Sequence, residues 1–272
     1  MLGYPRSSGA FGARNEVLVL PSVVCSTRVA QRIAGSDAVA ITHPHGCAHV
    51  GEDAIHAGEV FAGIAAHPNV AGVVVVGLGC ETIQGRELAE TIAARGQRVE
   101  FCSIQESGGS EATFERGRQL VAALRSEAQR AERVRVLDDA MRVGLDDPSA
   151  PIANALREAL GAAGVPLIEP RRGPGPAAHA ELAAEGAQIL VSYCRPGDAP
   201  RGFAICPVVS VAGDAASYAA LPDDFDLSIS AGIWKRADDL VQLLRDVFNG
   251  APTAAERRGA REFELRRLTR SM

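Results

Sequence analysis

Four consecutive valines, Val73 to Val76, constrain the fold more than any other stretch of the chain. Such a run is apolar on both faces of a strand, which is typical of a parallel sheet covered by helices on both sides. Two earlier apolar runs, residues 17–20 and 38–41, are spaced to leave room for a helix between strands. Apolar residues recur at i, i+3, i+4, i+7 and i+8 over residues 57–65, which indicates an amphipathic helix. The sequence therefore predicts an α/β fold made of repeated strand–helix units.

The same alternation continues and divides the chain into two parts. Helices over 84–95 and 111–131 and a strand at 98–104 complete the first part, and the periodicity weakens over residues 132–150. Further on we expect helices over 151–163, 177–185 and 240–248, strands near 165–168, 187–192, 203–212 and 225–230, and a last charged helix over 253–268. Residues 170–176 are rich in Pro and Gly and form a linker or a lid. We predict two consecutive Rossmann-like domains with mostly parallel sheets, residues 1–133 and 134–272.

The composition limits the kinds of partner. The chain has 272 residues and a formal net charge of −5, and no basic cluster is interleaved with aromatic residues. These features do not favour a nucleic acid or an anionic membrane as partner. No apolar run is long enough to span a membrane and no signal pattern is found, so we expect a cytoplasmic protein. Six cysteines in such a chain indicate buried thiols or site residues rather than a disulfide framework.

Each of the three apolar runs ends in side chains that can carry protons or bind metals. They lead to Cys25, to Thr42-His43-Pro44-His45-Gly46-Cys47, and to Cys80-Glu81. Ligands of open α/β sheets collect at the carboxyl ends of the strands, so we expect these residues to converge on one sheet edge. His43 and His45 can serve one site only if Pro44 turns the backbone. The cysteines fit no zinc-ribbon spacing, and small buried hydrophobic residues are the alternative interpretation.

Two other segments could hold an anion. Gln105 and Glu106 precede Ser107-Gly108-Gly109-Ser110, where a helix start offers backbone amides, although an ordinary N-cap is an equal alternative. Residues 3–15 carry Arg6, Arg14 and Asn15 in an ordered loop that could bind a carboxylate, with a frayed terminus as the alternative. His56 and His67 are interpreted as surface or helix-capping residues. Gly77-Leu78-Gly79 lacks the third glycine of a dinucleotide fingerprint, which argues against NAD binding.

Several motifs occur together in the order and spacing of one family. They are Gly3-Tyr4-Pro5-Arg6, Gly12-Ala13-Arg14-Asn15, residues 20–25, residues 42–47, His67-Pro68-Asn69, residues 77–81 and residues 104–109, with a thinner match at residues 207–211 and 226–232. With these motifs the chain resembles the large catalytic part of the altronate and galactarate dehydratase family, which includes the large subunit of sulfolactate sulfo-lyase.

The resemblance implies β-elimination, usually of water, from a sugar acid such as altronate or galactarate, or from a related hydroxy acid such as sulfolactate, to give a 2-keto acid. A divalent metal, typically ferrous iron, assists this chemistry, which needs a base, an acid and an electrophile. The expected catalytic residues are His43, His45, Glu81 and Glu106, and the expected metal ligands are Cys25, Cys47 and Cys80. The expected substrate-binding residues are Arg6, Arg14, Asn15, Thr42, Gln105 and Ser110. The sequence does not divide base and acid between the two histidines.

Two departures from the family pattern leave other functions open. Residues 142–147 stand where relatives carry Glu-Cys-Gly-Gly-Ser-Asp, and residues 192–197 stand where relatives carry Thr-Gly-Arg-Gly. The family's small N-terminal module is not found, so we expect a separate small SAF-like subunit as partner, and a homo-oligomer is also possible. The alternatives are a shortened, non-catalytic carboxylate-binding relative or subunit and, more weakly, a metal-dependent hydrolase.

Overall fold

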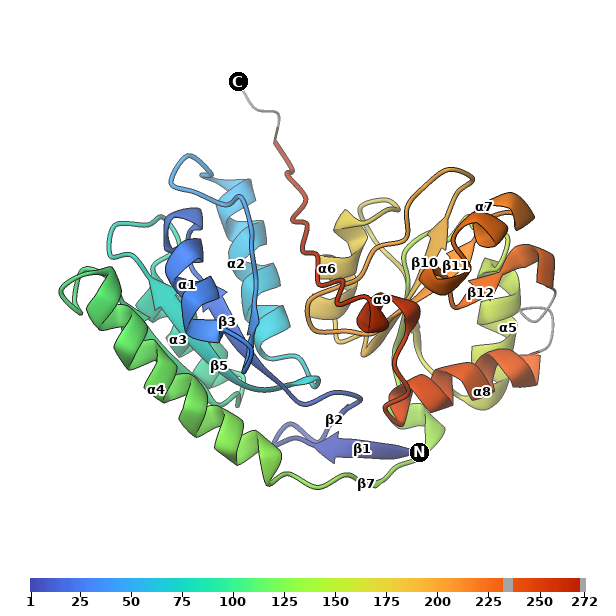
Figure 1. The fold of residues 1–272 in the computed structure, drawn as a ribbon, viewed down its shortest axis with the longest axis horizontal. Coiled ribbons are helices and arrows are strands. Elements are labelled where there is room, and N and C mark those ends of the chain that lie inside the picture. The colour runs from blue at the N-terminus through green and yellow to red at the C-terminus, as the bar shows by residue number, and fades with distance from the viewer. Residues whose placement is uncertain (232–236, 270–272) are drawn as a thin grey trace.

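The computed structural model describes residues 1–231 and 237–269 and divides into two halves, each built on a parallel sheet (Figure 1). Gly232, the last residue of one of the motifs, lies outside the described residues. The first sheet has the order β4-β3-β5-β6, with β3 (Glu16–Pro21), β4 (Val39–Ala40), β5 (Val70–Gly77) and β6 (Val99–Ser103) all parallel. The predicted α/β class with mostly parallel sheets is confirmed.

The valines of β5 explain why this sheet is covered on both faces. Val73 and Val75 pack in one core with residues of α2 (Glu52–Ala65) and α3 (Gly85–Ala94). Val74 and Val76 pack in a second core with residues of α1 (Thr27–Ala34) and α4 (Ser110–Gln129). All four valines are fully buried, because successive side chains of a strand point to opposite faces and a helix layer covers each face.

The second half repeats this architecture around a sheet of order β12-β11-β10-β8-β9. Its parallel strands are β8 (Val143–Leu145), β9 (Leu167–Ile168), β10 (Ile189–Cys194), β11 (Val208–Ala212) and β12 (Leu227–Ser228). One face packs on α5 (Ala153–Ala163) and α8 (Ala237–Phe248), and the other faces α6 (Ala177–Ala184). A short helix, α7 (Ala215–Ala220), follows β11, and an antiparallel ribbon of β1 (Leu2–Pro5), β2 (Phe11–Gly12) and β7 (Val134–Arg135) joins the halves at their base (Figure 1).

The two halves share one core where α2 packs on α6. A Cβ atom at Gly63 would lie 2.7 Å from Ala184 Cβ, so a glycine lets the helices approach closely. His56 lies against Glu181 on the same interface, at 3.4 Å between Nε2 and Oε1, and His67 Nε2 lies 3.0 Å from the carbonyl of Ala187. Both histidines are buried. Their interpretation as surface residues is therefore wrong, because His56 on α2 and His67 just after its end both lie at the interface between the halves.

The predicted helix over 253–268 is also wrong in most of its length. Only α9 (Ala254–Arg257) is helical, and it begins with a capping box between Thr253 and Glu256. Gly259 then adopts a φ of 69°, the left-handed conformation with which helices commonly end. Residues 260–268 form neither helix nor strand and run between α2 and α6 (Figure 1). None of the helices in the described parts of the chain is long and apolar enough to cross a membrane.

Candidate functional site at the sheet edges

The carboxyl edge of the first sheet contains a topological switch point. Because β4 and β5 flank β3 on opposite sides, a crevice between β3 and β5 is the expected ligand position. The segments after these strands meet there: Ser22 Oγ donates to Glu81 Oε1 at 2.8 Å, and the amide of Val24 donates to the carbonyl of His45 at 2.7 Å. The predicted His/Cys turn thus lies beside the ends of both neighbouring strands.

His43 uses both ring nitrogens to hold this turn. Its Nε2 lies 2.7 Å from the carbonyl of Pro21, and its Nδ1 accepts from the amide of His45 at 3.2 Å. This pattern assigns the proton to Nε2. Burial lowers the pKa of the imidazole, although the bond to Pro21 opposes the shift. His43 is therefore a neutral ring committed to backbone contacts.

His45 differs because neither of its ring nitrogens has a hydrogen-bond partner among the described residues, although the residue is only 1% exposed. Its ring lies 4.8 Å from that of His49 and edge-on to Phe61 at 5.9 Å, measured between centroids. Burial, followed by the nearby His49 and His43, lowers the pKa of His45 to about 4. His45 is the residue with two such buried nitrogens at this sheet edge, and buried polar groups are normally satisfied, which makes it a candidate for binding a ligand. His45 is a neutral imidazole able to accept a proton.

Glu81 stabilises the turn after β5 through hydrogen bonds to its carboxylate. Its carboxylate accepts from the Ser22 hydroxyl and from the amides of Leu78, Gly79 and Gly85. Burial alone would raise the pKa of this carboxyl, but the hydrogen bonds outweigh burial and lower it. An ionised and fully bonded carboxylate is poorly suited to donate a proton, so this geometry favours a structural use of Glu81.

The three cysteines of the edge, Cys25, Cys47 and Cys80, are all exposed, so the alternative that they are buried hydrophobic residues is wrong. Cys47 Sγ lies 3.9 Å from the carbonyl of Cys80, which places two of them side by side. Within residues 1–231 and 237–269, no three His, Cys, Asp or Glu side chains gather closely enough to hold a metal ion. The residues in this conformation therefore do not fit the implied divalent metal.

The remaining predicted residues divide between two edges of the sheet. Thr42, Gln105, Glu106 and Ser110 are exposed at or near the carboxyl edge, with Glu106 paired to Arg86 at 2.7 Å. Asn15 and Arg14 precede β3, and Arg6 binds the carbonyl of Pro68 before β5 at 2.6 Å, so all three lie at the opposite edge. The expectation that Arg6, Arg14 and Asn15 share a site with the histidines is therefore wrong in this structure.

Arg14 shows why the opposite edge is structural. Its guanidinium binds both carboxylate oxygens of Glu256, at 2.6 and 2.8 Å, and the carbonyls of Ala13, Val247 and Ala251. Asn15 donates to the carbonyl of Ala128 at 2.7 Å. These side chains bond backbone carbonyls of segments far apart in the sequence and so hold those segments together. The donors of Arg14 are used within the protein and are not free to bind a substrate carboxylate.

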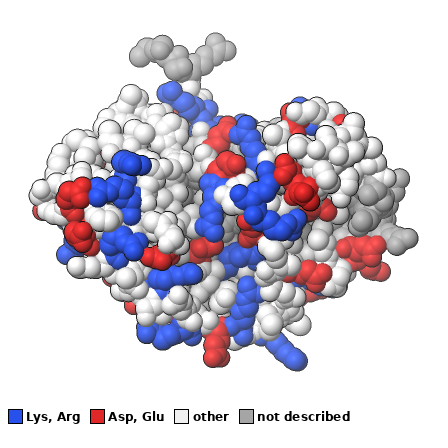
Figure 2. Space-filling model, viewed as in Figure 1, with Lys and Arg blue, Asp and Glu red and all other residues white. Residues whose placement is uncertain are grey.

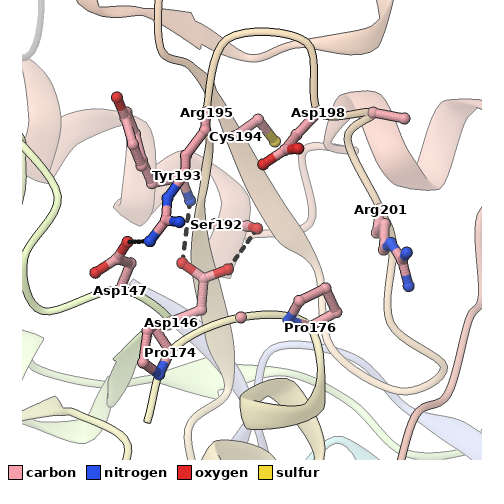
Figure 3. A pocket seen from close by; sticks show the side chains of 12 residues that line it. Asp146, Asp147, Pro174, Pro176, Ser192, Tyr193, Cys194, Arg195, Asp198 and Arg201 are labelled. Atoms are coloured by element: carbon pink, nitrogen blue, oxygen red, sulfur yellow. Dashed lines mark hydrogen bonds and ion pairs between the residues drawn. The ribbon is translucent and has the colours of Figure 1, made fainter.

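A second polar site lies at the switch point of the second sheet, and the two segments that depart from the family pattern, residues 142–147 and 192–197, contribute to it. There β9 and β10 flank β8, and a cavity of about 410 Å³ opens beyond β8 and β10 (Figure 3). Asp146 is its buried floor, accepting from Ser192 Oγ at 2.6 Å and the amide of Tyr193 at 3.0 Å, and lying 3.0 Å from His179 Nε2. Arg195 reaches Asp147 at 3.3 Å on the cavity wall, and Arg201 lies opposite.

One signal could have revealed this second site. Asp146 and Asp147 directly follow the apolar run Val143-Gly144-Leu145, as Cys80 and Glu81 follow the valines of β5. The Pro/Gly-rich stretch supplies Pro174, Gly175 and Pro176 to the same wall, so it lines the cavity. His179 carried no local signal, because its partner Asp146 is 33 residues away in the sequence.

Comparison with known proteins agrees with the motifs. Residues 3–129 match the family model described as D-galactarate dehydratase/altronate hydrolase, second domain. Altronate dehydratase of Escherichia coli (strain K12) is 30% identical over 158 residues, which are 53% of this chain and 32% of the relative. The (2R)-sulfolactate sulfo-lyase subunit beta of Chromohalobacter salexigens is 34% identical over 109 residues, 39% of this chain and 28% of the relative.

A second altronate dehydratase, from Bacillus subtilis (strain 168), is 31% identical over 116 residues, which are 38% of this chain and 23% of the relative. The matched part of the chain thus spans about a third or less of these curated relatives. The resemblance predicted from the motifs is confirmed: over residues 3–129, which carry the first sheet and its His/Cys turn, the chain is similar to the second domain of the D-galactarate dehydratase/altronate hydrolase family.

Proposed function

We propose that this chain carries the elimination site of a lyase that acts on a sugar acid or a related hydroxy acid. The observation that supports the proposal most is His45, a buried imidazole near the switch point of the first sheet whose two ring nitrogens have no partner among the described residues. The proteins that this part of the chain resembles are named altronate dehydratase and sulfolactate sulfo-lyase subunit beta. Candidate substrates are altronate, galactarate and sulfolactate. The product class is a 2-keto acid.

In the proposed reaction His45 acts as the general base. A neutral imidazole accepts the proton from the carbon beside the substrate carboxylate. In a sugar acid the hydroxyl on the next carbon leaves as water, taking a proton from solvent, and in sulfolactate the sulfonate on the next carbon leaves as sulfite. The resulting enol becomes the keto acid by proton transfer. His49 packs beside this base, with its ring 4.8 Å from that of His45 between centroids. His43 and Glu81 position the turn through their hydrogen bonds, and base and acid are thereby no longer shared equally between His43 and His45.

The metal and the partner are separate parts of the proposal. Ferrous iron is the metal that the resemblance implies, and Cys47 and Cys80, whose thiols are exposed, could hold it only after the loops at this edge rearrange. The name of one relative, a subunit beta, describes an enzyme of more than one subunit. We propose a small SAF-like subunit as the partner of this chain, and a cytoplasmic location for the complex.

The proposal is tested by following 2-keto acid formation from each acid, with and without ferrous iron and a candidate small subunit. We expect His45→Asn to lower the rate by about 100-fold or more, the usual scale for losing a general base. His56→Asn is the matched control, because His56 is also buried but lies on the α2–α6 interface. Equal rates for His45→Asn and the wild type would refute His45 as the base.

A non-catalytic carboxylate-binding relative is the second candidate function. The observation that favours it is that no metal-binding group is assembled in the described residues. In this case the acids would raise the melting temperature while no keto acid forms under any condition. Turnover of any of the acids would exclude this alternative.

A further inference from the structure

We propose that residues 260–269, called the strap from here on, form a movable cover over the junction of α2 and α6 and control access to His45. This inference rests on the proposed function of that histidine. Figure 1 shows the strap rising between the two helices, and Figure 2 shows charged side chains of both signs gathered along the middle of the same face. The contacts of the strap suggest a fixed base and a releasable upper part.

The base of the strap is fixed by close packing. A Cβ atom at Gly202 would lie 2.0 Å from the carbonyl oxygen of Ala260, so the two backbones touch. The amide of Gly202 also donates to Glu262 at 2.7 Å. Since only glycine permits this approach, the strap is anchored to the second half at its start.

The middle of the strap covers the wall behind the proposed base. The Phe263 ring lies between Phe61 and Phe203, with centroids 6.4 and 6.0 Å away. Phe61 in turn packs against His43 and His45, at 4.5 and 5.9 Å. Phe263 thus closes the aromatic layer on which both imidazoles rest.

The upper part is held by polar contacts to both halves. Arg266 binds Glu181 at 3.2 Å and the carbonyl of Gly173 at 2.9 Å. The amide of Leu268 donates to Asp53 at 2.6 Å, and the Thr269 hydroxyl donates to the same carboxylate. Water can replace each of these bonds when the strap leaves, so their net contribution to closure is modest.

Beyond Leu265, the last strap residue that packs against the hydrophobic core, the strap is held by the polar contacts of Arg266, Leu268 and Thr269. It belongs to no helix or sheet, so no ladder of backbone hydrogen bonds holds it. Segments held by a few side-chain contacts are those that open locally at low cost. His45 is 1% exposed in the closed arrangement, so a substrate can meet this base only after a cover has moved.

The test measures the reactivity of His45 toward diethyl pyrocarbonate in the full-length protein, by mass spectrometry. Phe263→Ala and Thr269→Val each weaken the strap. Arg261→Ala is the matched control, because Arg261 belongs to the strap but pairs with Glu16 at the start of β3, at 3.4 Å, rather than with α2 or α6. His67, buried between the halves, is the internal reference for global unfolding. We expect carbethoxylation of His45 to be about tenfold faster in Phe263→Ala, since truncating a packed phenyl ring shifts an opening equilibrium by at least that factor. His67 and the control variant should show no change.

Unchanged His45 reactivity in both strap variants would overturn the proposal. Parallel increases at His45 and His67 in both variants would overturn it as well, because they would mean exposure by unfolding. Increased reactivity at His45 alone supports the strap whether or not keto acid forms. Failure of the strap and failure of the lyase proposal are therefore distinguishable.

Discussion

The Asn69 side chain joins the two halves of the protein through four hydrogen bonds to backbone groups. Its side-chain oxygen accepts from the amides of Ala13 and Arg14 at 2.8 and 3.2 Å. Its side-chain nitrogen donates to the carbonyls of Gln188 and Ile205 at 2.9 and 3.1 Å. The residue is fully buried, so water cannot replace it. Asn69→Ala would leave two amides and two carbonyls without a partner.

The expected loss of unfolding free energy is about 4 kcal/mol, taking roughly 1 kcal/mol for each of the four groups left unpaired. A loss of this size is a large share of the roughly 5–15 kcal/mol that stabilises a typical domain. Urea unfolding followed by circular dichroism measures it. Asn15→Ala is the control, since it removes a single bond to Ala128 and should cost about 1 kcal/mol.

A loss of less than about 1 kcal/mol in Asn69→Ala would refute the reasoning, because it would show that the buried backbone groups find other partners. Asn69→Asp separates the two sides of the junction. It keeps the acceptor for Ala13 and Arg14 but places a carboxylate oxygen against the carbonyls of Gln188 and Ile205, so it should destabilise the protein at neutral pH as much as alanine does.

Three further predictions follow from buried contacts elsewhere. Gly63→Ala should lower the unfolding free energy by about 1–3 kcal/mol by forcing α2 from Ala184, whereas Gly58→Ala on the same helix, with no atom within 4 Å of its Cβ position, should stabilise the protein, both measured by urea unfolding. Burial lowers the pKa of His67 from 6.5 to about 4 in the folded protein. Between these pH values the unfolded chain binds a proton at His67 that the folded protein does not, so the unfolding free energy should fall by about 3 kcal/mol as the pH drops from 6.5 to 4. His67→Gln should remove this part of the pH dependence, and an unchanged slope would contradict the assignment. Glu81→Gln turns an amide group toward backbone donors and should lower thermal stability by about 1–3 kcal/mol, and a neutral result would argue against its role in the turn.

The first sheet could be predicted from the sequence because its signals are local. A strand buried on both faces needs an unbroken apolar run, and residues 73–76 provide one in which alternate valines enter different cores. The strap could not be predicted as such, because its charged pattern also fits a helix. Only the φ of 69° at Gly259 shows where the helix ends.

The candidate site was predicted in composition but not in the roles of its members. The sequence gives no reason to distinguish His43 from His45. They differ in the structure because the carbonyl of Pro21, 22 residues away, bonds the ring of His43, whereas no described group bonds the ring of His45. The cavity at Asp146 depends on pairing with His179, 33 residues away. Partners this distant are set by topology, which local patterns do not encode.

The motifs that suggested substrate binding make structural contacts instead. Arg6, Arg14 and Asn69 belong to motifs shared with the family, yet their polar atoms bind backbone groups and Glu256 at the edge opposite the histidines. Arg14 and Glu256 are 242 residues apart, so this contact closes the whole chain. If these motifs fix the two sheets relative to each other, Arg14→Lys should lower stability without changing the affinity for any acid. An altered affinity at unchanged stability would instead return Arg14 to the substrate site.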